Sequence, residues 1–432
     1  MKNKRYSNYK WMVWSTLSLS FIIVMFLRLS TGVISDNLSN ELGFTAMQIS
    51  NISSITLYSY AVMQIPGGIL IDKYGPRKTA SIFIIIASIG SILFGMTKSI
   101  EVAYISRFMV GFGSSVIAVS VYKIQGNWFR EDEYSQASAK FALVGNIGAV
   151  LSTFPLVFLT EAIGWRGTFY LIGAIGIIMG IMIFACVRNN PHEYGFENCL
   201  NVQINEVRNL NNTKVDNKSK FKDGVNAIIK NKSTWYNSLI MFSLVGVTTA
   251  FTSLWGIPYI VEVYEISKSN AAIILSFMTY GLIVGSMIAD ILSKKFNSNP
   301  LNLVRIGGII NFFIWIMLVV IFRTKAPIIM LPVVFFIIGC VNMNYIYLFT
   351  DIKNNTQNEY CGVSTSVVNT SEFIGSGVIN IFIGFALGTP RGGYTLAFSI
   401  FIVMSIITIV ASSYGLKVSR RSNLENVEIE YA

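Results

Sequence analysis

The stretch Gly67-Gly68-Ile69-Leu70-Ile71-Asp72-Lys73-Tyr74-Gly75-Pro76-Arg77-Lys78 decides the fold, because it is a short charged loop between two long apolar segments. A second stretch, Gly285-Ser286-Met287-Ile288-Ala289-Asp290-Ile291-Leu292-Ser293-Lys294-Lys295-Phe296, aligns with it without a gap. Asp72 then falls on Asp290, and Arg77 falls on Lys295. Internal repeats of this kind are frequent among membrane transporters. The two stretches therefore predict a duplicated transporter.

The composition supports a membrane protein. The 432 residues are 53% hydrophobic and 13% charged, whereas soluble domains carry about 25% charged residues. Windows of about 20 residues predict an all-α membrane protein with twelve transmembrane helices. We expect these spans at residues 11–35, 46–71, 79–97, 102–126, 136–160, 168–187, 234–262, 269–292, 303–323, 326–349, 363–388 and 394–416.

The spans divide into two pseudo-symmetric six-helix bundles, residues 1–187 and 234–416. Residues 188–233 are rich in Asn, Lys and Ser and read as a cytoplasmic linker between the bundles. Residues 417–432 form a cytoplasmic tail. A second pair of loops, Gly164-Trp165-Arg166 and Pro390-Arg391-Gly392, lies at equivalent places in the two halves. The predicted duplication therefore covers whole halves.

The net charge of +11 does not indicate nucleic-acid binding, because the basic residues gather in alternate loops. They precede span 1, follow spans 2 and 12, and fill the linker. This positive-inside bias places both termini in the cytoplasm. The Asn, Lys and Ile bias of the chain suggests an AT-rich, bacterial genome, so we expect the bacterial cell membrane. The four cysteines form no CxxC pair, so we expect neither a disulfide framework nor a metal site. No cofactor is expected.

The loop motif predicts a conformational latch on the cytoplasmic side. The glycine pair at the end of span 2 lets a neighbouring helix approach closely, and the carboxylate of Asp72 is suited to a helix N-terminus. Arg77 can brace Asp72 by an ion pair. The alternative is that these charges only end the helix and obey the positive-inside rule. The predicted latch residues are Gly68, Asp72, Gly75, Arg77, Asp290 and Lys295.

Three charged residues inside the spans are candidates for substrate contact, because charges within a membrane are costly and usually functional. Arg28 lies deep in span 1 and Arg107 in the outer part of span 4. Two arginines facing one cavity suit an anion, since a guanidinium can hold a carboxylate or phosphate by two hydrogen bonds. Glu372 lies near the middle of span 11 and could carry a proton, pair with an arginine or hold an amine. The alternatives are a helix-bracing role for Arg107 and a structural role for Glu372.

Polar and aromatic residues on other spans complete the predicted cavity. Such residues suit a small-molecule site, although each could equally be a helix-packing contact. The candidates are Tyr60 and Gln64 on span 2, Asn146 on span 5, Trp255 and Tyr259 on span 7, Asn342 and Tyr345 on span 10, and Asn369 on span 11. On span 11, Ser376 and Asn380 continue the polar stripe of Glu372.

These motifs resemble those of the major facilitator superfamily over nearly the full chain. Gly68-x3-Asp72-Lys73-x-Gly75-Pro76-Arg77-Lys78 resembles its loop 2–3 signature, and Arg107-Phe108-x2-Gly111-x-Gly113 resembles its span 4 signature. Arg28 in span 1 is similar to the arginine of its organic-anion branches, the organophosphate antiporters and sialin-like symporters. The run Leu254-Trp255-Gly256-Ile257-Pro258-Tyr259 resembles a poorly characterised bacterial branch. The resemblance implies alternating access and a monomer.

The sequence therefore predicts a secondary active or facilitative transporter of a small, anionic organic solute, and no enzyme. A proton is the candidate coupling ion. Three alternatives stay open: a proton-coupled efflux pump for drugs or cations, a dipeptide or amino-acid carrier in which Arg28 and Glu372 clamp a zwitterion, and a membrane sensor without transport.

Overall fold

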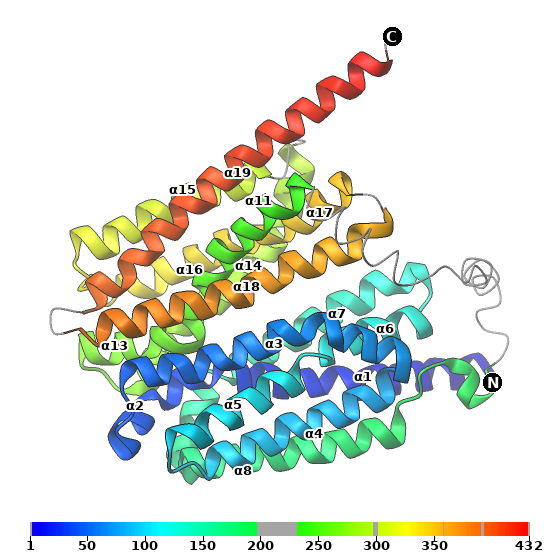
Figure 1. Ribbon diagram of the computed structural model, residues 1–432, viewed down its shortest axis with the longest axis horizontal. Helices are drawn as coiled ribbons and strands as arrows, with labels where there is room; N and C mark the ends of the chain where they lie inside the picture. The colour runs from blue at the N-terminus through cyan, green and yellow to red at the C-terminus, as the bar shows by residue number, and fades with distance from the viewer. Residues whose placement is uncertain (1, 197–230, 297–300, 357, 390–392, 431–432) are drawn as a thin grey trace. The chain divides into compact units, whose positions relative to one another are not determined.

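The computed structural model describes residues 2–196, 231–296, 301–356, 358–389 and 393–430, drawn as coloured ribbon in Figure 1. In these ranges the chain forms helices joined by short turns, with no strand. The predicted all-α class is confirmed for this part of the chain. Most of the predicted linker, residues 197–230, lies outside the described ranges. The predicted domain boundaries therefore stay predictions.

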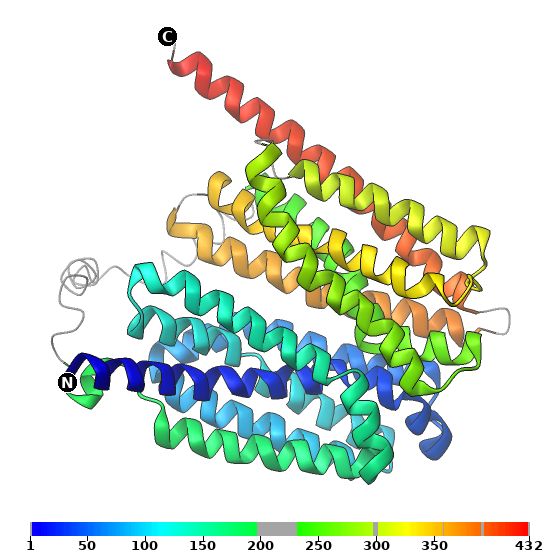
Figure 2. The same cartoon turned by 180° about the vertical axis from the view of Figure 1, so that it is seen from behind.

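Several of the first six predicted spans consist of more than one helix. Span 1 changes helix at Ser30, and span 4 changes helix after Ser114. Gly164 has a φ of 74°, a conformation that glycine adopts readily, so the chain turns there between predicted spans 5 and 6. The helices are α1 (Lys2–Leu29), α2 (Thr31–Leu42), α3 (Ala46–Tyr74), α4 (Pro76–Gly95), α5 (Ile100–Ser114), α6 (Ile117–Trp128), α7 (Glu131–Leu151), α8 (Phe154–Cys186) and the 3-10 turn η1 (Pro191–Tyr194). The dark-blue ribbon in Figure 2 is α1.

The described part of the second half contains three π-helical turns, in which the hydrogen bonds run from residue i to i+5; such turns are frequent at functional sites. Two of them, η2 and η3, interrupt span 7. The elements are α11 (Lys232–Ile240), η2 (Met241–Val245), α12 (Gly246–Ala250), η3 (Phe251–Trp255), α13 (Gly256–Tyr264), α14 (Lys268–Phe296), α15 (Leu301–Ile316), η4 (Met317–Ile321), α16 (Met330–Asn342), the 3-10 turn η5 (Met343–Tyr345), α17 (Ile346–Asn355), α18 (Asn358–Leu387) and α19 (Tyr394–Glu430).

Ten helical segments in the described ranges are long and apolar enough to cross a membrane. The number becomes eleven if the bent pair Ala46–Gln64 and Pro66–Tyr74 within α3 is one span. Pro66 removes a backbone donor inside this helix, which is a common cause of such a bend. The polar first turns of α7 leave that helix outside the count. The protein is therefore a multi-pass membrane protein.

The helices pack into two compact units. The first contains Met1–Arg28, Ser59–Ser152 and Leu159–Asp223. Within it, α4 and α5 pack closely because small residues line their contact. A Cβ atom on Gly113 would lie 2.3 Å from the carbonyl oxygen of Phe83. The last glycine of the span 4 motif is thus required by the approach of two backbones.

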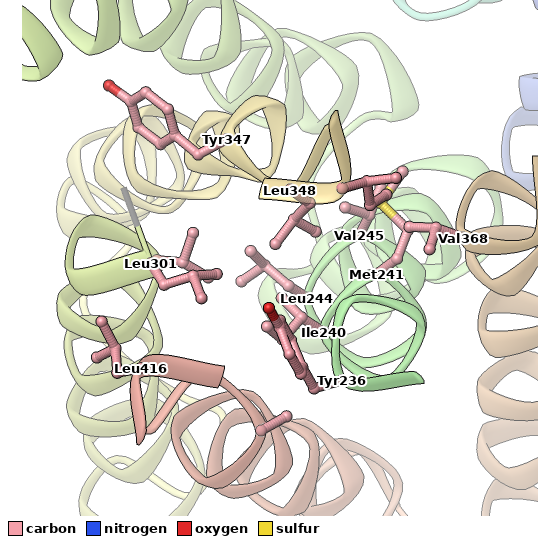
Figure 3. Packing of buried hydrophobic residues seen from close by; sticks show 13 residues of the cluster. Tyr236, Ile240, Met241, Leu244, Val245, Leu301, Tyr347, Leu348, Val368 and Leu416 are labelled. Carbon is pink, nitrogen blue, oxygen red and sulfur yellow. The ribbon is translucent and has the colours of Figure 1, made fainter. Parts of the chain in front are cut away.

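The second unit contains Leu29–Tyr58, Thr153–Phe158 and Gly224–Ala432. One of its buried apolar clusters joins span 7 to spans 9, 10, 11 and 12. Figure 3 shows side chains from α11 and η2 beside those of α15 and α17. Members labelled there include Tyr236, Ile240, Leu244, Leu301, Tyr347, Leu348, Val368 and Leu416. This cluster fixes the first turns of span 7, which also carry the polar side chains of Ser233 and Asn237.

The first glycines of the two copies of the loop motif contact equivalent spans. A Cβ atom on Gly67 would lie 2.7 Å from Val116, between the two helices of span 4. A Cβ atom on Gly285, the aligned residue, would lie 2.5 Å from the carbonyl oxygen of Cys340 in span 10. Spans 4 and 10 are equivalent in a duplicated chain. These matching contacts support the internal repeat inferred from the sequence.

Candidate functional site

The loop after span 2 holds its shape through residues of the first unit. Gly75 has a φ of 81°, and a Cβ atom there would lie 2.6 Å from the Asn189 side chain, so this position needs glycine. The backbone N–H of Arg77 donates to Oδ1 of Asn189 at 3.0 Å, and its Nε donates to the carbonyl oxygen of Phe184 at 2.7 Å. Gly68 has nothing within 4 Å of an added Cβ. The close approach predicted for the glycine pair therefore belongs to Gly67 alone.

The predicted ion pair between Asp72 and Arg77 is wrong. Asp72 pairs with Lys123, whose Nζ lies 2.8 Å from Oδ1, and the guanidinium of Arg77 lies over the Phe184 ring instead. Both partners of the pair are largely exposed, and such pairs contribute little stability. The side chains of Asp290 and Lys295 lie outside the described residues.

Arg107 is fully buried and braces helices. Its Nη1 donates to the carbonyl oxygen of Leu27 at 3.0 Å. Its guanidinium lies 4.1 Å from the centre of the Phe94 ring and 5.3 Å from that of Phe169. The side chain thereby ties together spans 1, 3, 4 and 6. The bracing alternative fits this enclosure, whereas the predicted substrate contact does not.

Arg28 occupies the last turn of α1, directly after the residue that Arg107 holds. Its side chain is half-buried. Carbonyl groups in the last turn of a helix lack helical N–H partners and carry partial negative charge, which favours a guanidinium there. Arg107 and Arg28 thus differ in kind, since the first is enclosed and the second keeps part of its surface accessible.

Glu372 lies half-buried on α18 and accepts a hydrogen bond from Oγ1 of Thr249 on span 7 at 3.0 Å. Asn369, one turn earlier, is also half-buried. Further along the helix, Ser50 donates to the backbone carbonyl of Asn380, and Ser54 donates to that of Gly377 at 3.0 Å. The predicted cavity-lining stripe therefore ends before Asn380, whose side chain is buried against α3.

Other predicted cavity residues make packing contacts. Tyr259 is buried and its hydroxyl donates to the carbonyl oxygen of Thr324 at 2.8 Å. Tyr345 packs against the apolar cluster of Figure 3. Asn342 is buried and donates to Oγ1 of Thr248 at 2.6 Å. For these three the helix-packing alternative fits, and their contact with substrate stays a prediction.

The remaining candidates differ in burial. Trp255 is buried on η3, and its indole nitrogen has no hydrogen-bond partner among the described residues. Tyr60 is buried on α3, whereas Gln64 and Asn146 are half-buried. Their roles in substrate binding stay predictions.

Sequence reasoning missed a buried carboxylate, Asp351 on α17. Its Oδ2 accepts hydrogen bonds from Ser233 Oγ at 2.9 Å, Tyr236 OH at 2.5 Å and Asn237 Nδ2 at 2.7 Å. These donors lie in the first turns of α11, where the helix dipole favours an anion. Asp351 stands just after the predicted end of span 10 and reads as an ordinary loop acid. Its position at the end of an apolar run is the one sequence signal for it.

An ion pair between two helices of the second unit was also missed. Lys268, at the start of α14, lies 3.1 Å from the carboxylate of Asp36 on α2. Nearby, a Cβ atom on Gly32 would lie 2.8 Å from the carbonyl oxygen of Leu254. Helix α2, which contains the C-terminal end of predicted span 1, thus contacts span 7 through one close backbone approach and the start of α14 through one charge pair.

The family of the chain follows from comparison with known proteins. The sequence profile of the Major Facilitator Superfamily matches residues 16–380, so the chain belongs to this superfamily, as its motifs predicted. The chain is a membrane transporter of that class.

Among solved structures, the chain is similar to a bacterial homologue of the human lysosomal transporter Spinster in an inward-facing, unoccupied conformation, with a TM-score of 0.75, 17% identity and coverage of 95% and 97% of the two chains. It is also similar to a D-xylose–proton symporter, with a TM-score of 0.69, 12% identity and coverage of 94% and 97%. These likenesses confirm the predicted twelve-helix fold.

Relatives named as probable transporters align over much of the chain. A probable hexose phosphate transport protein of Chlamydia trachomatis is 22% identical, over 72% of this chain and 73% of the relative. A probable sulfoacetate transporter of Cupriavidus necator is 21% identical over 90% of both. A probable L-galactonate transporter of Escherichia coli is 25% identical, over 62% of this chain and 58% of the relative.

Proposed function

We propose that the protein transports a small organic anion by alternating access, and that Arg28 binds the acidic group of the substrate. The observation that carries this proposal is the contrast between the two arginines. Arg107 is enclosed by aromatic rings, whereas Arg28 is half-buried at a break in span 1. A guanidinium can hold a carboxylate, phosphate or sulfonate group by two parallel hydrogen bonds.

The relatives support the same substrate class. Hexose phosphate, sulfoacetate and L-galactonate, which their names give as substrates, all carry a negative group. A pump for lipophilic cations needs acidic side chains in its cavity. Of the three charged candidates for substrate contact, only Glu372 is an acid. The chain therefore favours an anion over a cationic drug.

Arg107 prepares the site without touching the substrate. By holding the carbonyl of Leu27, it fixes the turn from which Arg28 projects. This gives a preorganised guanidinium, which reduces the entropy lost when an anion binds.

Glu372 is proposed as the second functional group. Its bond to Thr249 joins spans 11 and 7, and a carboxylate at this depth is expected to exchange a proton or contact polar groups of the substrate. The cytoplasmic termini, the bacterial cell membrane and the monomeric state belong to the same proposal. The latch at Asp72 stays a prediction.

Uptake into proteoliposomes tests the proposal. Labelled hexose phosphate, galactonate and sulfoacetate are offered with and without a pH gradient, alongside a cationic dye. We expect saturable uptake of at least one anion, lost in Arg28→Ala and weakened in Arg28→Lys. Arg5→Ala is the matched control, because Arg5 is an exposed arginine on the same helix. Dye transport without anion transport, or wild-type anion uptake by Arg28→Ala, contradicts the proposal.

A further inference from the structure

A row of hydrogen-bonded polar side chains runs through the second unit. Nδ2 of Asn311 donates to the carbonyl oxygen of Gly307 at 3.1 Å and to Oδ1 of Asn342 at 2.6 Å. Nδ2 of Asn342 donates in turn to Oγ1 of Thr248 at 2.6 Å. The row connects spans 9, 10 and 7 inside the membrane.

The donor and acceptor roles in this row leave the amide oxygen of Asn311 without a hydrogen bond among the described residues. Because a carbonyl oxygen can only accept, the contact with Gly307 fixes which end of the Asn311 amide is the nitrogen. Oδ1 of Asn311 then has no hydrogen-bond partner among the described residues, although the residue is only 3% exposed. A buried acceptor of this kind requires a donor or a cation.

Oδ1 belongs to a residue that lines a small cavity with both polar and apolar walls. The cavity measures about 10 Å³, which is room for one water-sized particle. Its polar lining comes from η2, α15, α16 and α19, and its apolar lining from η2, α12 and α15. The lining residues are Ser243, Leu244, Val247, Asn311, Trp315, Asn342, Ser405 and Thr408.

The hydroxyl groups of the lining also present acceptors. Ser405 donates its proton to the carbonyl oxygen of Phe401 at 2.8 Å. Thr408 lies 3.1 Å from the carbonyl oxygen of Met404 and 2.7 Å from Oγ of Ser243, and it has one proton for both. Since these protons are committed to protein oxygens, the oxygen lone pairs are what remains for a bound particle.

The backbone beside the cavity is irregular. The π-helical turn η2 supplies Ser243 and Leu244, and its bonds widen to i+5, with Gly246 N–H donating to the Met241 carbonyl. Irregular turns of membrane helices, with loosened carbonyl groups, are where transporters commonly hold Na⁺. The lining contains no carboxylate, which disfavours a divalent ion.

We propose that this cavity binds a single Na⁺ through neutral oxygens of Asn311, Ser243, Ser405 and Thr408. Thr248 accepts the last hydrogen bond of the row, from Asn342. The next residue, Thr249, donates to Glu372. Occupancy of the cavity thereby affects the position of span 7 beside Glu372. Na⁺ is then the coupling ion of the transport cycle. This coupling role rests on the proposed anion transport, whereas Na⁺ binding to the cavity is independent of it.

Binding of radioactive Na⁺ to the purified, full-length transporter tests the site without any substrate. Choline replaces Na⁺ at constant ionic strength, and the unfolding temperature is followed in parallel. We expect saturable binding and an unfolding temperature that rises with Na⁺ and not with choline. Ser405→Ala should weaken binding at least fivefold and Asn311→Leu at least tenfold, while Asn311→Asp should tighten it by adding a charge.

Ser412→Ala is the matched control. Ser412 is a buried serine on the same helix that donates to the backbone carbonyl of Thr408 one turn earlier, as Ser405 does to that of Phe401, and it does not line the cavity. If Asn311→Leu does not fold, Ser405→Ala and Ser412→Ala decide the question. Absence of Na⁺ binding to the wild type means that the cavity holds only water and overturns the proposal, as does equal binding by the two serine variants. Neither result affects the test of anion uptake with Arg28.

Discussion

Replacement of Arg107 separates a bracing residue from a substrate-binding one. In Arg107→Leu the carbonyl of Leu27 loses its donor and the rings of Phe94 and Phe169 lose their cation. A hydrogen bond from a charged donor contributes about 1.5–3 kcal/mol. A desolvated cation–π contact adds about 2 kcal/mol. Leucine avoids the burial of a charge, which offsets part of the loss, so we expect a destabilisation of about 2–4 kcal/mol.

Two measurements on the same variants check this. Denaturant unfolding of the purified protein in micelles gives the stability, and titration with a transported anion gives the Kd. Arg107→Leu should lose stability while its Kd changes less than that of Arg28→Ala. Arg107→Lys, which keeps the charge without the planar fork, should lie between wild type and Arg107→Leu in stability.

The control is Arg5→Leu, which removes the same charge from an exposed position and should leave both quantities near wild type. Wild-type stability in Arg107→Leu together with lost anion binding would refute the bracing role. That result would instead indicate that Arg107 binds the substrate.

Three further results are expected from unfolding measurements. Gly32→Ala should destabilise the protein by about 1–3 kcal/mol, because the new methyl group meets the Leu254 carbonyl; an unchanged unfolding temperature contradicts this contact. Asp351→Asn should lower stability by about 1.5–3 kcal/mol through the loss of a charged acceptor for the three donors of α11 and for Asn355, and equal stability would show that the charge is dispensable. Burial raises the pKa of the Glu133 carboxyl, but the hydrogen bond from Lys10 and neighbouring charges outweigh it, so this pKa lies below its usual value. The Lys10–Glu133 pair therefore stabilises the folded state above the usual pKa of a glutamate, and this stabilisation is lost as the pH falls through the folded-state pKa. Glu133→Gln should then make the unfolding temperature fall less steeply between about pH 5 and 3. The same slope in the variant and the wild type would contradict a stabilising Lys10–Glu133 pair.

The sequence was sufficient for features that depend on neighbours in the chain. Gly75 precedes a proline at a helix start, and its positive φ follows from that turn. Gly67 and Gly285 could be matched because the two loops repeat each other, and their contacts with spans 4 and 10 agree with the repeat. The membrane spans followed from hydropathy because each is a continuous apolar run.

Partners distant in the chain could not be predicted. The role of Arg107 depends on Phe94, Phe169 and the carbonyl of Leu27, which come from three other spans. Hydrophobic rings in spans 3 and 6 look the same in the sequence whether they face lipid or enclose a cation. The loop motif shows the same limit, since Asp72 has several lysines and arginines nearby and only the fold selects Lys123.

The polar stripe on span 11 shows why helical periodicity alone overstates a cavity. A polar face in a membrane helix must avoid lipid, but it can do so by lining a cavity or by packing on another polar helix. Toward the end of α18 the second solution applies, because Ser50 and Ser54 bond to its backbone. Glu372 lies before this contact and bonds instead to Thr249. The part of the stripe that can still bind substrate or a proton is therefore the turn that contains Asn369 and Glu372. Variants of these two residues should change the transport rate more than variants of Asn380.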